Sequence, residues 1–365
     1  MRLIFFYLAH RNGRYYLEEF FPTEGYYWLL KRMIETEIVD EVIVIAESGK
    51  RFPAVEYMPG FTGHVVPSIE DVPGGLREDD IIWVRGGWKS WFSFLEKISP
   101  DHWLLFYGAN TGRGRWPFWD VIFNDLAGRD YVDNCGRIHF DFRKPTHPEI
   151  FYPMVLEREY DLCIGASHIH DKKGQWRGIK AVMACRDIFV GEKLKCILPG
   201  AFRRGVMTND ILDDIRTHDL DVALPGMLSR DELRSVYNQS KLFIHLGSGG
   251  QGDRGVLEAM RCGCPIMVGF PEYHAPFTYQ SELSYVAADP HHLRALAYEI
   301  HKQIKESTGE KRLDVFQYHE IECGVETNIL PRMKKLFSIL RDCPKAGKGV
   351  ETQNLAPLLG GGVLL

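Results

Sequence analysis

Short apolar runs that alternate with longer amphipathic stretches constrain the fold of this chain more than any other feature. The runs are rich in Val, Ile, Leu and Phe, and the first five lie at residues 3–9, 41–47, 80–86, 102–109 and 120–126. An amphipathic stretch at 25–35 predicts a helix between the first two. Strands that are apolar throughout are typical of parallel sheets covered by helices on both faces. The N-terminal part therefore predicts a parallel α/β unit.

Residues 137–154 interrupt this rhythm, because they contain three prolines and no helical period. They predict a linker. The alternation then restarts, with apolar runs at 160–167, 195–202, 221–226, 241–247 and 264–270. We therefore expect an α/β protein with two Rossmann-like domains in series, covering residues 1–155 and 156–325, and a ligand cleft between them.

An amphipathic helix pattern follows the second domain. Its apolar residues recur at steps of three and four: Ile329, Met333, Leu336, Phe337 and Leu340. One face of a helix at 326–344 is therefore built to be buried, and we expect this helix to cross back and pack on the N-terminal domain. The tail at 345–365 is rich in glycine and has no period, so we expect it to be mobile.

Composition argues against several classes of protein. The formal net charge is -5, so no basic excess indicates a nucleic acid or an anionic membrane as partner. The N-terminal apolar run ends after Ala9, too short for a signal peptide, and no later run reaches the length of a transmembrane segment. Eight cysteines are scattered, and Cys262 and Cys264 lack a second Cys/His pair at zinc-site spacing. We expect buried free thiols and a reducing, cytoplasmic location, with peripheral membrane attachment left open.

A glycine-rich loop at residues 247–255 indicates chemistry most directly. It follows the buried run 241–247 and precedes a helix that begins near Asp253 or Arg254. Glycines let the backbone approach a ligand closely, and the helix start offers free N–H groups and a positive dipole end to an anion. The loop predicts a phosphate cradle, and a flexible loop without a ligand is the alternative. The residues expected to bind the ligand here are Ser248, Gly250, Gln251, Asp253 and Gly255.

The segment LEAMRCGCPIMV (257–268) closely resembles the donor motif of the retaining glycosyl transferases group 1 family (glycosyltransferase family 4-like), which has the two-domain GT-B fold. In that family a motif glutamate holds the ribose hydroxyls of the nucleotide, and Glu258 falls on it. Arg254 and Gly255 fall at the helix start, where backbone N–H groups meet the diphosphate. An earlier glutamate, which contacts the donor sugar, is replaced by Gly250. Either Gln251 or Asp253 could reach the same space.

The resemblance covers about residues 158–270. The segment LCIGASHIHDKKGQWRGIKAV (162–182) is similar to the first strand and loop of the family's C-terminal domain, where an arginine and a lysine clamp the diphosphate. Gly165 matches the glycine of that motif, and Lys173 matches the lysine if the loop is two residues longer. Ala166 stands in place of the arginine. A solvated turn is the alternative interpretation of Lys173.

The N-terminal half matches the family only in its alternation of apolar runs and helical patterns. Gly25 lies at a helix start after the first strand, where the family often has a glycine loop near the acceptor. The loop after the run 102–109 is expected to face the cleft. Asn110, Thr111 and Arg113 stand there in the region where the family often has a catalytic histidine.

The resemblance implies a hexosyltransferase-like enzyme with an N-terminal acceptor domain and a C-terminal donor domain. Its donor would be a nucleoside-diphosphate sugar of UDP or GDP, and the anomeric configuration would be retained. Lys173, Arg254 and the helix start would stabilise the leaving diphosphate, without a cofactor or a metal, and Asn110 is the catalytic candidate of the N-terminal domain. The acceptor is left open between a glycan, a lipid-linked sugar and a small molecule.

Three other functions compete with this interpretation. A sugar-nucleotide epimerase shares the two-domain fold, but the acid and base residues it needs cannot be assigned in this sequence. A catalytically degenerate nucleotide-sugar-binding protein is favoured by the two departures from the family motifs, at Ala166 and Gly250. An enzyme that modifies nucleic acid is disfavoured by the net charge.

Overall fold

The computed structural model describes residues 1–86, 88–108, 116–124, 130–133, 137–165, 168–169, 173–202, 206–247, 254–270, 284–286, 289–343 and 345. The chain forms two compact units. The first contains Met1–His147 and the chain from Val325 onward, and the second contains Pro148–Gly324. Each unit has its own sheet and its own hydrophobic core.

Within the described residues, nine strands form the sheet of the first unit, in the order β3-β4-β2-β1-β5-β6-β7-β9-β8. Their bounds are β1 Arg2–Ala9, β2 Glu41–Glu47, β3 Val55–Met58, β4 Phe61–Val66, β5 Ile81–Arg85, β6 Trp103–Tyr107, β7 Val121–Asn124, β8 Tyr131–Val132 and β9 Ile138–Asp141. Only the edge strands β3 and β8 are antiparallel to their neighbours in this set. The first five predicted strands are β1, β2, β5, β6 and β7, so the prediction of a parallel α/β unit is confirmed.

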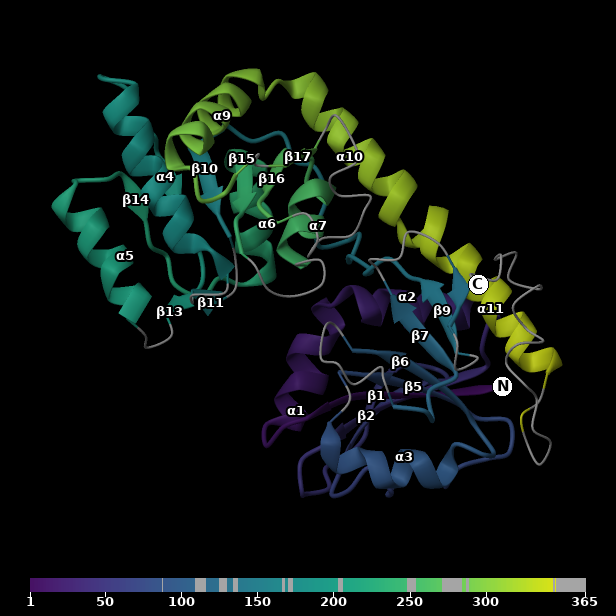
Figure 1. The fold of residues 1–365 in the computed structure, drawn as a ribbon. Helices are drawn as coiled ribbons and strands as arrows, with labels where there is room; N and C mark the ends of the chain where they lie inside the picture. Colours follow the sequence, from purple (N-terminus) through teal and green to yellow (C-terminus); the bar gives the residue numbers. More distant parts are fainter. Residues whose placement is uncertain are drawn as a thin grey trace. The chain divides into compact units, whose positions relative to one another are not determined.

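Helices cover both faces of this sheet (Figure 1). Their bounds are α1 Gly13–Tyr15, α2 Gly25–Glu35, α3 Phe92–Ile98 and α11 Leu330–Asp342, and α2 matches the predicted helix at 25–35. Successive side chains of a strand point to opposite faces. Phe5 of β1 therefore lies in a core cluster with residues of α2 and α11, whereas Phe6 lies in a cluster with residues of α3.

Helix α11 is part of the core of the first unit, although it follows the whole second unit in the chain. Its predicted apolar face is buried in the same cluster as α2 and β1. Arg332 of α11 donates to the Asp130 carboxylate at 2.6 Å, and Glu326, in the turn just before α11, accepts from Arg32 of α2 at 2.7 Å. Full burial of each large apolar side chain stabilises a fold by about 1.5–3 kcal/mol. This helix is therefore integral to the first unit.

The sheet of the second unit has, among the described residues, six parallel strands in the order β14-β12-β10-β15-β16-β17. Their bounds are β10 Tyr160–Ile164, β12 Cys196–Ile197, β14 Val222–Ala223, β15 Ser240–His245, β16 Ile266–Val268 and β17 Ser284–Val286. A separate short pair joins β11 His168–Ile169 to β13 Ala201–Phe202. Numbered along the chain, the six strands follow the order 3-2-1-4-5-6, which is the Rossmann order.

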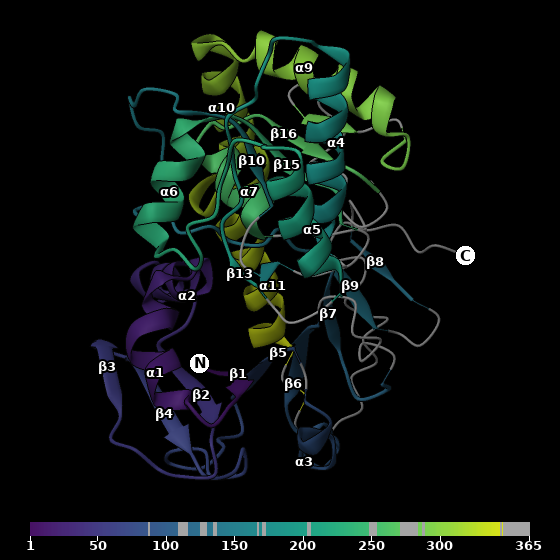
Figure 2. The ribbon, with the colours of Figure 1, turned by 90° about the vertical axis from the view of Figure 1, so that its left-hand side faces the viewer.

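Six described helices cover this second sheet. Their bounds are α4 Gln175–Ile188, α5 Val206–Thr217, α6 Arg230–Gln239, α7 Arg254–Arg261, α9 Leu293–Glu306 and α10 Gly309–Cys323. Leu162 and Ile164 of β10 pack with α4, α5 and α9, whereas Cys163 packs with α6, α7 and α10. Figure 2 shows these helices around the strands of the second sheet. The second unit is therefore also a sheet between two helical layers, as predicted.

The prediction of a linker over residues 137–154 is wrong in its first part. Residues Ile138–Asp141 form β9, which pairs with β7 and β8. The prolines that motivated the prediction come later, at 145, 148 and 153. Phe151 is buried in the core of the second unit, and the Met154 N–H donates to Asn238 Oδ1 at 2.7 Å. The chain thus joins the second unit at residue 148 rather than at the expected boundary after residue 155.

The cysteines pack in hydrophobic cores. Six described cysteines are free and buried, namely Cys163, Cys185, Cys196, Cys262, Cys264 and Cys323, and Cys343 is partly exposed. Burial raises the pKa of the Cys185 thiol to about 12 and that of the Cys163 thiol well above its ordinary value. The interpretation of Cys262 and Cys264 as core residues is confirmed.

We expect a maleimide reagent at pH 8 to modify Cys343, and none of the six buried cysteines, in the native protein. The thiolate is the reactive form, and burial both disfavours it and blocks access to it. Peptide mass spectrometry before and after unfolding in guanidinium gives the comparison, because all cysteines should react in the unfolded chain. Fast labelling of Cys262 or Cys264 in the native state would contradict their burial.

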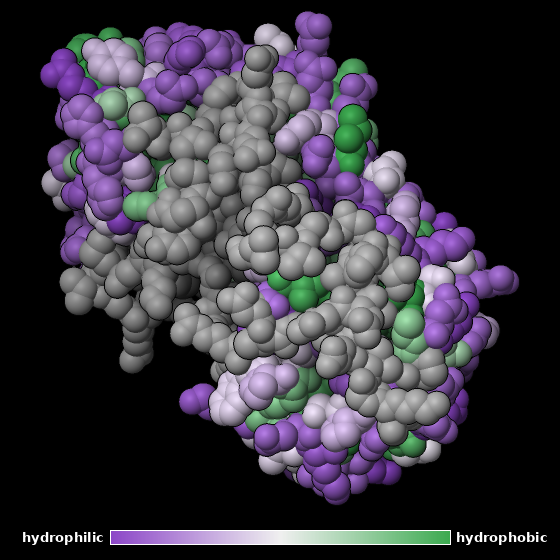
Figure 3. Space-filling view, turned by 45° about the vertical axis from the view of Figure 1, so that its right-hand side comes forward, coloured by the Kyte–Doolittle hydropathy of each residue, from purple (hydrophilic) through white to green (hydrophobic). Residues whose placement is uncertain are grey.

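No helix in the described part of the chain is long and apolar enough to span a bilayer. On the face that Figure 3 presents, the described residues are mainly hydrophilic, and hydrophobic residues occur in small scattered groups. Scattered apolar residues of this kind are ordinary on protein surfaces. This face therefore offers no large apolar patch among its described residues as a binding surface.

Candidate functional site

The carboxyl ends of β10 and β15 lie side by side at the centre of the second sheet. The chain leaves β10 toward α4 on one face and leaves β15 toward α7 on the other. In open α/β sheets, such a reversal of strand order creates the crevice in which ligands bind. Gly165 follows β10, and Gly247 opens the glycine-rich loop after β15. Two segments predicted from the sequence to bind the donor therefore start from neighbouring strands.

Backbone packing brings these segments into contact. Gly165 has a φ of +59° and Gly174 a φ of +72°, in the region that favours glycine. The Gly165 N–H donates to the Ile244 carbonyl at 2.8 Å. A Cβ on Gly174 would overlap the Leu246 carbonyl and lie 2.5 Å from the Gly247 nitrogen. The turn before α4 is thus pressed against the start of the glycine-rich loop.

Lys173 lies immediately before this contact and is half-buried. Its position beside the start of the glycine-rich loop suits a phosphate ligand, and this role stays a prediction. Several predicted site residues lie outside the described part of the chain. They are Asn110, Thr111 and Arg113 in the first unit and Ser248, Gly250, Gln251 and Asp253 in the second.

Helix α7 carries the residues predicted to meet the nucleotide. It begins at the half-buried Arg254, and Gly255 and Glu258 are buried in it. The Glu258 side chain is 9% exposed, and its Oε1 accepts a hydrogen bond from Arg230 Nη1 at 2.8 Å. No described residue is bonded to the second carboxylate oxygen. The arrangement fixes the carboxylate with one cation and leaves an acceptor for a ligand hydroxyl.

Two further residues at this edge were missed by the sequence analysis. Arg177, in the first turn of α4, donates from Nη1 to the Leu246 carbonyl at 3.3 Å, and its guanidinium carbon lies 5.0 Å from the centre of the Phe270 ring. Phe270 follows β16 and has a φ of +61°, which is strained for a bulky side chain. Strain of this kind is concentrated at functional sites. Nothing in the local sequence indicates that residues 177, 246 and 270 meet.

The first unit has an equivalent reversal of strand order between β1 and β5. Arg85, the last residue of β5, donates to the buried Glu24 carboxylate at 2.7 Å. Its guanidinium carbon lies 4.9 Å from the centre of the Tyr7 ring and 5.0 Å from that of the Tyr26 ring. This ion pair joins a buried carboxylate to a half-buried arginine beside two aromatic rings, and it forms a second candidate site, which the sequence analysis did not name.

Gly25 lies next to this pair, at the start of α2. A Cβ there would overlap the Pro145 carbonyl and lie 2.8 Å from the Thr146 nitrogen. Close packing of α2 against the backbone thus explains why glycine is needed. The predicted ligand contact of Gly25 stays a prediction, and its neighbour Glu24 is the buried carboxylate that pairs with Arg85.

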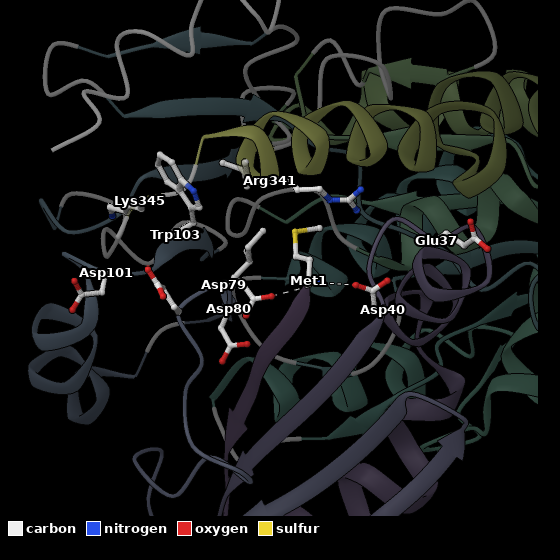
Figure 4. Close-up of a pocket in the computed structure, with 12 residues that line it drawn as sticks. Met1, Glu37, Asp40, Asp79, Asp80, Asp101, Trp103, Arg341 and Lys345 are labelled. Carbon is white, nitrogen blue, oxygen red and sulfur yellow. Dashed lines mark hydrogen bonds and ion pairs between the residues drawn. The ribbon is translucent and has the colours of Figure 1, made fainter. Parts of the chain in front are cut away.

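A cavity of about 580 Å³ in the first unit lies at the opposite edge of the sheet, where β1, β5 and β6 begin (Figure 4). Its lining residues are Met1, Glu37, Asp40, Glu78, Asp79, Asp80, Ile81, Asp101, Trp103, Leu340, Arg341 and Lys345. Six of these are acidic, so the lining repels an anionic nucleotide. Ligands of α/β sheets also bind at the carboxyl ends of the strands rather than here. This cavity is therefore not the candidate site.

Comparison with known proteins shows the fold of the chain. No protein-family model matches the sequence, and no curated protein is significantly similar to it. Solved structures are similar in fold over almost the whole chain, at low sequence identity. The sucrose-phosphate synthase of Thermosynechococcus elongatus is 12% identical, with a TM-score of 0.64 over 93% of this chain and 99% of that one.

Two other structures give the same result. HepE of Anabaena, in complex with UDP and glucose, is 12% identical, with a TM-score of 0.61 over 93% of this chain and 100% of that one. A glycosyltransferase of Rickettsia africae is 13% identical, with a TM-score of 0.60 over 93% of this chain and 97% of that one. The chain is thus similar in fold to two-domain GT-B glycosyltransferases, as the sequence resemblance predicts. A shared fold does not by itself establish a shared reaction.

Proposed function

We propose that this chain is a glycosyltransferase that moves a sugar from a nucleoside-diphosphate sugar to an acceptor. The observation that carries the proposal is the arrangement at the ends of β10 and β15. There Gly174, the residue after Lys173, lies against the start of the glycine-rich loop, and a buried carboxylate, Glu258, follows one turn into α7. A diphosphate fits a cation, a glycine loop and a helix start. A ribose fits a fixed carboxylate, which accepts hydrogen bonds from its hydroxyls.

The proposed mechanism follows from the charge of the leaving group. Negative charge builds on the diphosphate as the bond to the sugar breaks, and fixed cations and N–H donors stabilise it. Lys173, Arg254 and the start of α7 would supply these groups in the second unit, and Asn110 is the candidate of the first. Retention of the anomeric configuration and a reaction that needs no metal are part of the proposal.

The acceptor is proposed to bind in the first unit, at the carboxyl ends of β1 and β5. Glu24, Arg85 and the rings of Tyr7 and Tyr26 support this assignment, because charged groups and aromatic faces together suit the hydroxyls and apolar faces of a sugar. A glycan, a lipid-linked sugar or a small molecule would fit these groups. The two units would thus act as acceptor domain and donor domain.

Nucleotide binding is the first test of the proposal. We expect UDP or GDP to raise the melting temperature of the full chain, because a ligand of the native state stabilises it by about 2.7 kcal/mol at a hundredfold excess over Kd. UDP comes first, because HepE, a structure of similar fold, was solved with UDP and glucose. Orthophosphate at equal ionic strength is the control. Absence of a shift with any nucleoside diphosphate at millimolar concentration would defeat the donor-site assignment.

Turnover separates the proposed enzyme from its alternatives. Incubation with a panel of nucleotide sugars, scored by release of nucleoside diphosphate, should identify the donor. Binding without release from any member would indicate a degenerate nucleotide-sugar-binding protein. Conversion of one nucleotide sugar into its epimer, with no diphosphate released, would indicate an epimerase.

A further inference from the structure

Arg177 is a buried cation at the edge of the sheet where the donor is proposed to bind. It lies in the first turn of α4, three residues after the glycine that touches the start of the glycine-rich loop. Only 9% of its surface is exposed. The position places a guanidinium beside the ends of both β15 and β16.

The charge of Arg177 has no carboxylate partner among the described residues. Among the described residues, its side chain makes one hydrogen bond, from Nη1 to the Leu246 carbonyl, and its Nε has no partner. Burial lowers the pKa of this guanidinium, although an arginine keeps its charge in proteins. A buried charge is costly unless it is paired and hydrogen-bonded. Within the described part of the chain, the charge of Arg177 is therefore not balanced.

The other two buried arginines of the described chain are paired. Arg2 donates to the Asp80 carboxylate from Nε at 2.8 Å and from Nη2 at 2.6 Å. Arg261 forms an ion pair with Glu320. In both cases a carboxylate partner compensates the buried charge, so a structural role accounts for the arginine. Arg177 lacks such an explanation within the described residues.

Aromatic rings hold the guanidinium of Arg177 in place. Its central carbon lies 4.5 Å from the centre of the Trp176 ring and 5.0 Å from that of the Phe270 ring. Phe270 adopts a left-handed backbone conformation at the end of β16, which costs energy for a bulky residue. Because the faces of the guanidinium lie against these rings, its N–H groups can form hydrogen bonds only along its planar edge. That edge matches a phosphate or a carboxylate in two parallel hydrogen bonds.

We propose that Arg177 binds an oxyanion of the nucleotide sugar, which is a phosphate of its diphosphate or a carboxylate on its sugar. This inference rests on the proposed function and adds one residue to it. The oxyanion would complete the charge balance of the site on binding. Arg177 would then contribute to affinity rather than to the stability of the ligand-free fold.

The test uses the full chain and measures binding by calorimetry with UDP, UDP-glucose, UDP-glucuronate and uridine. Arg177→Met keeps an unbranched side chain between the rings and removes the charge. We expect it to weaken the binding of UDP about ten- to a hundredfold, with uridine unaffected. If the sugar carboxylate is the partner, only UDP-glucuronate should lose affinity. The affinity of Arg177→Lys for UDP should lie between those of Arg177→Met and wild type, because lysine keeps the charge but lacks the planar guanidinium.

Two controls separate this role from a structural one. Arg186→Met removes an exposed arginine from the last turn of the same helix and should leave all four affinities unchanged. The ligand-free Arg177→Met protein should melt at the wild-type temperature or above it, because an unpaired buried charge is removed. If Arg177→Met binds all three nucleotides as tightly as wild type does, the inference about Arg177 is wrong. The same holds if uridine and UDP lose affinity by equal factors. Either result would leave the proposed function intact. A wild-type chain that binds none of them would overturn the proposed function as well.

Discussion

Replacing Gly174 with alanine should destabilise the second unit by about 2–5 kcal/mol and remove nucleotide binding. A left-handed conformation costs about 1–2 kcal/mol for a residue with a Cβ, and Gly174 has a φ of +72°. The new Cβ would also overlap the Leu246 carbonyl, and forced overpacking costs about 1–3 kcal/mol. Because the overlap is with backbone, no side-chain rotation relieves it. The turn before α4 must move away from the glycine-rich loop.

Thermal unfolding followed by circular dichroism gives the measurement. One kcal/mol lowers the melting temperature by about 2–4 °C in a domain of this size, so a decrease of about 10 °C is expected. Gly191→Ala is the matched control, since Gly191 also has a positive φ, +94°, but no atom of the described residues lies within 4 Å of its Cβ position. The Gly191→Ala variant should lose only the free energy that the left-handed backbone conformation costs, without the overlap. Equal losses in the two variants would show that the contact between Gly174 and Leu246 is unimportant.

Much of the architecture is readable from the sequence, because each central strand is buried on both faces. The runs around β1, β2, β5 and β6 consist almost wholly of apolar residues, and a run of that kind has few other stable environments. The helix α2 was predicted with its observed bounds. Strand β9 was missed because it lies near a sheet edge and is short, with His139 and Asp141 among its four residues. The prolines just beyond it then dominated the local pattern.

The candidate site is only partly readable from the sequence. Gly165, Lys173 and Glu258 were named from motifs, and the fold brings their segments to one edge of the sheet. Pairs formed by distant residues were not predicted. Glu24 and Arg85 are 61 positions apart, and Arg177 meets Phe270 only because β16 ends beside α4. Such partners depend on strand order, which a periodicity analysis of one sequence does not fix.

The ion pair between Arg230 and Glu258 also changes what a substitution at Glu258 is expected to do. The pair links the first residue of α6 to α7, and both side chains are largely buried. Removing one partner of a buried pair costs about 3–5 kcal/mol, since the other charge is left uncompensated. Glu258→Ala should therefore lower stability as well as nucleotide affinity. Its effect on binding must be measured on folded protein at 25 °C.

Glu258→Ala should weaken UDP binding about ten- to a hundredfold, the loss of one charge-assisted hydrogen bond. The ribose role makes a sharper prediction, which a loss of stability cannot imitate. Wild type should bind UDP more tightly than 2′-deoxy-UDP, and Glu258→Ala should bind the two alike. Arg230→Met disrupts the same ion pair but keeps the carboxylate, so it should retain the preference for UDP.

Glu232→Ala provides the matched control for this comparison. Glu232 is an exposed carboxylate in the capping box of α6, where its side chain accepts the Ser229 N–H at 2.7 Å. Its loss should cost about 0.3–1.5 kcal/mol of stability and leave both affinities unchanged. If Glu258→Ala still prefers UDP to the deoxy analogue by the wild-type factor, Glu258 does not hold the ribose. Its carboxylate would then serve only to pair Arg230, and the donor site would lack its proposed ribose ligand.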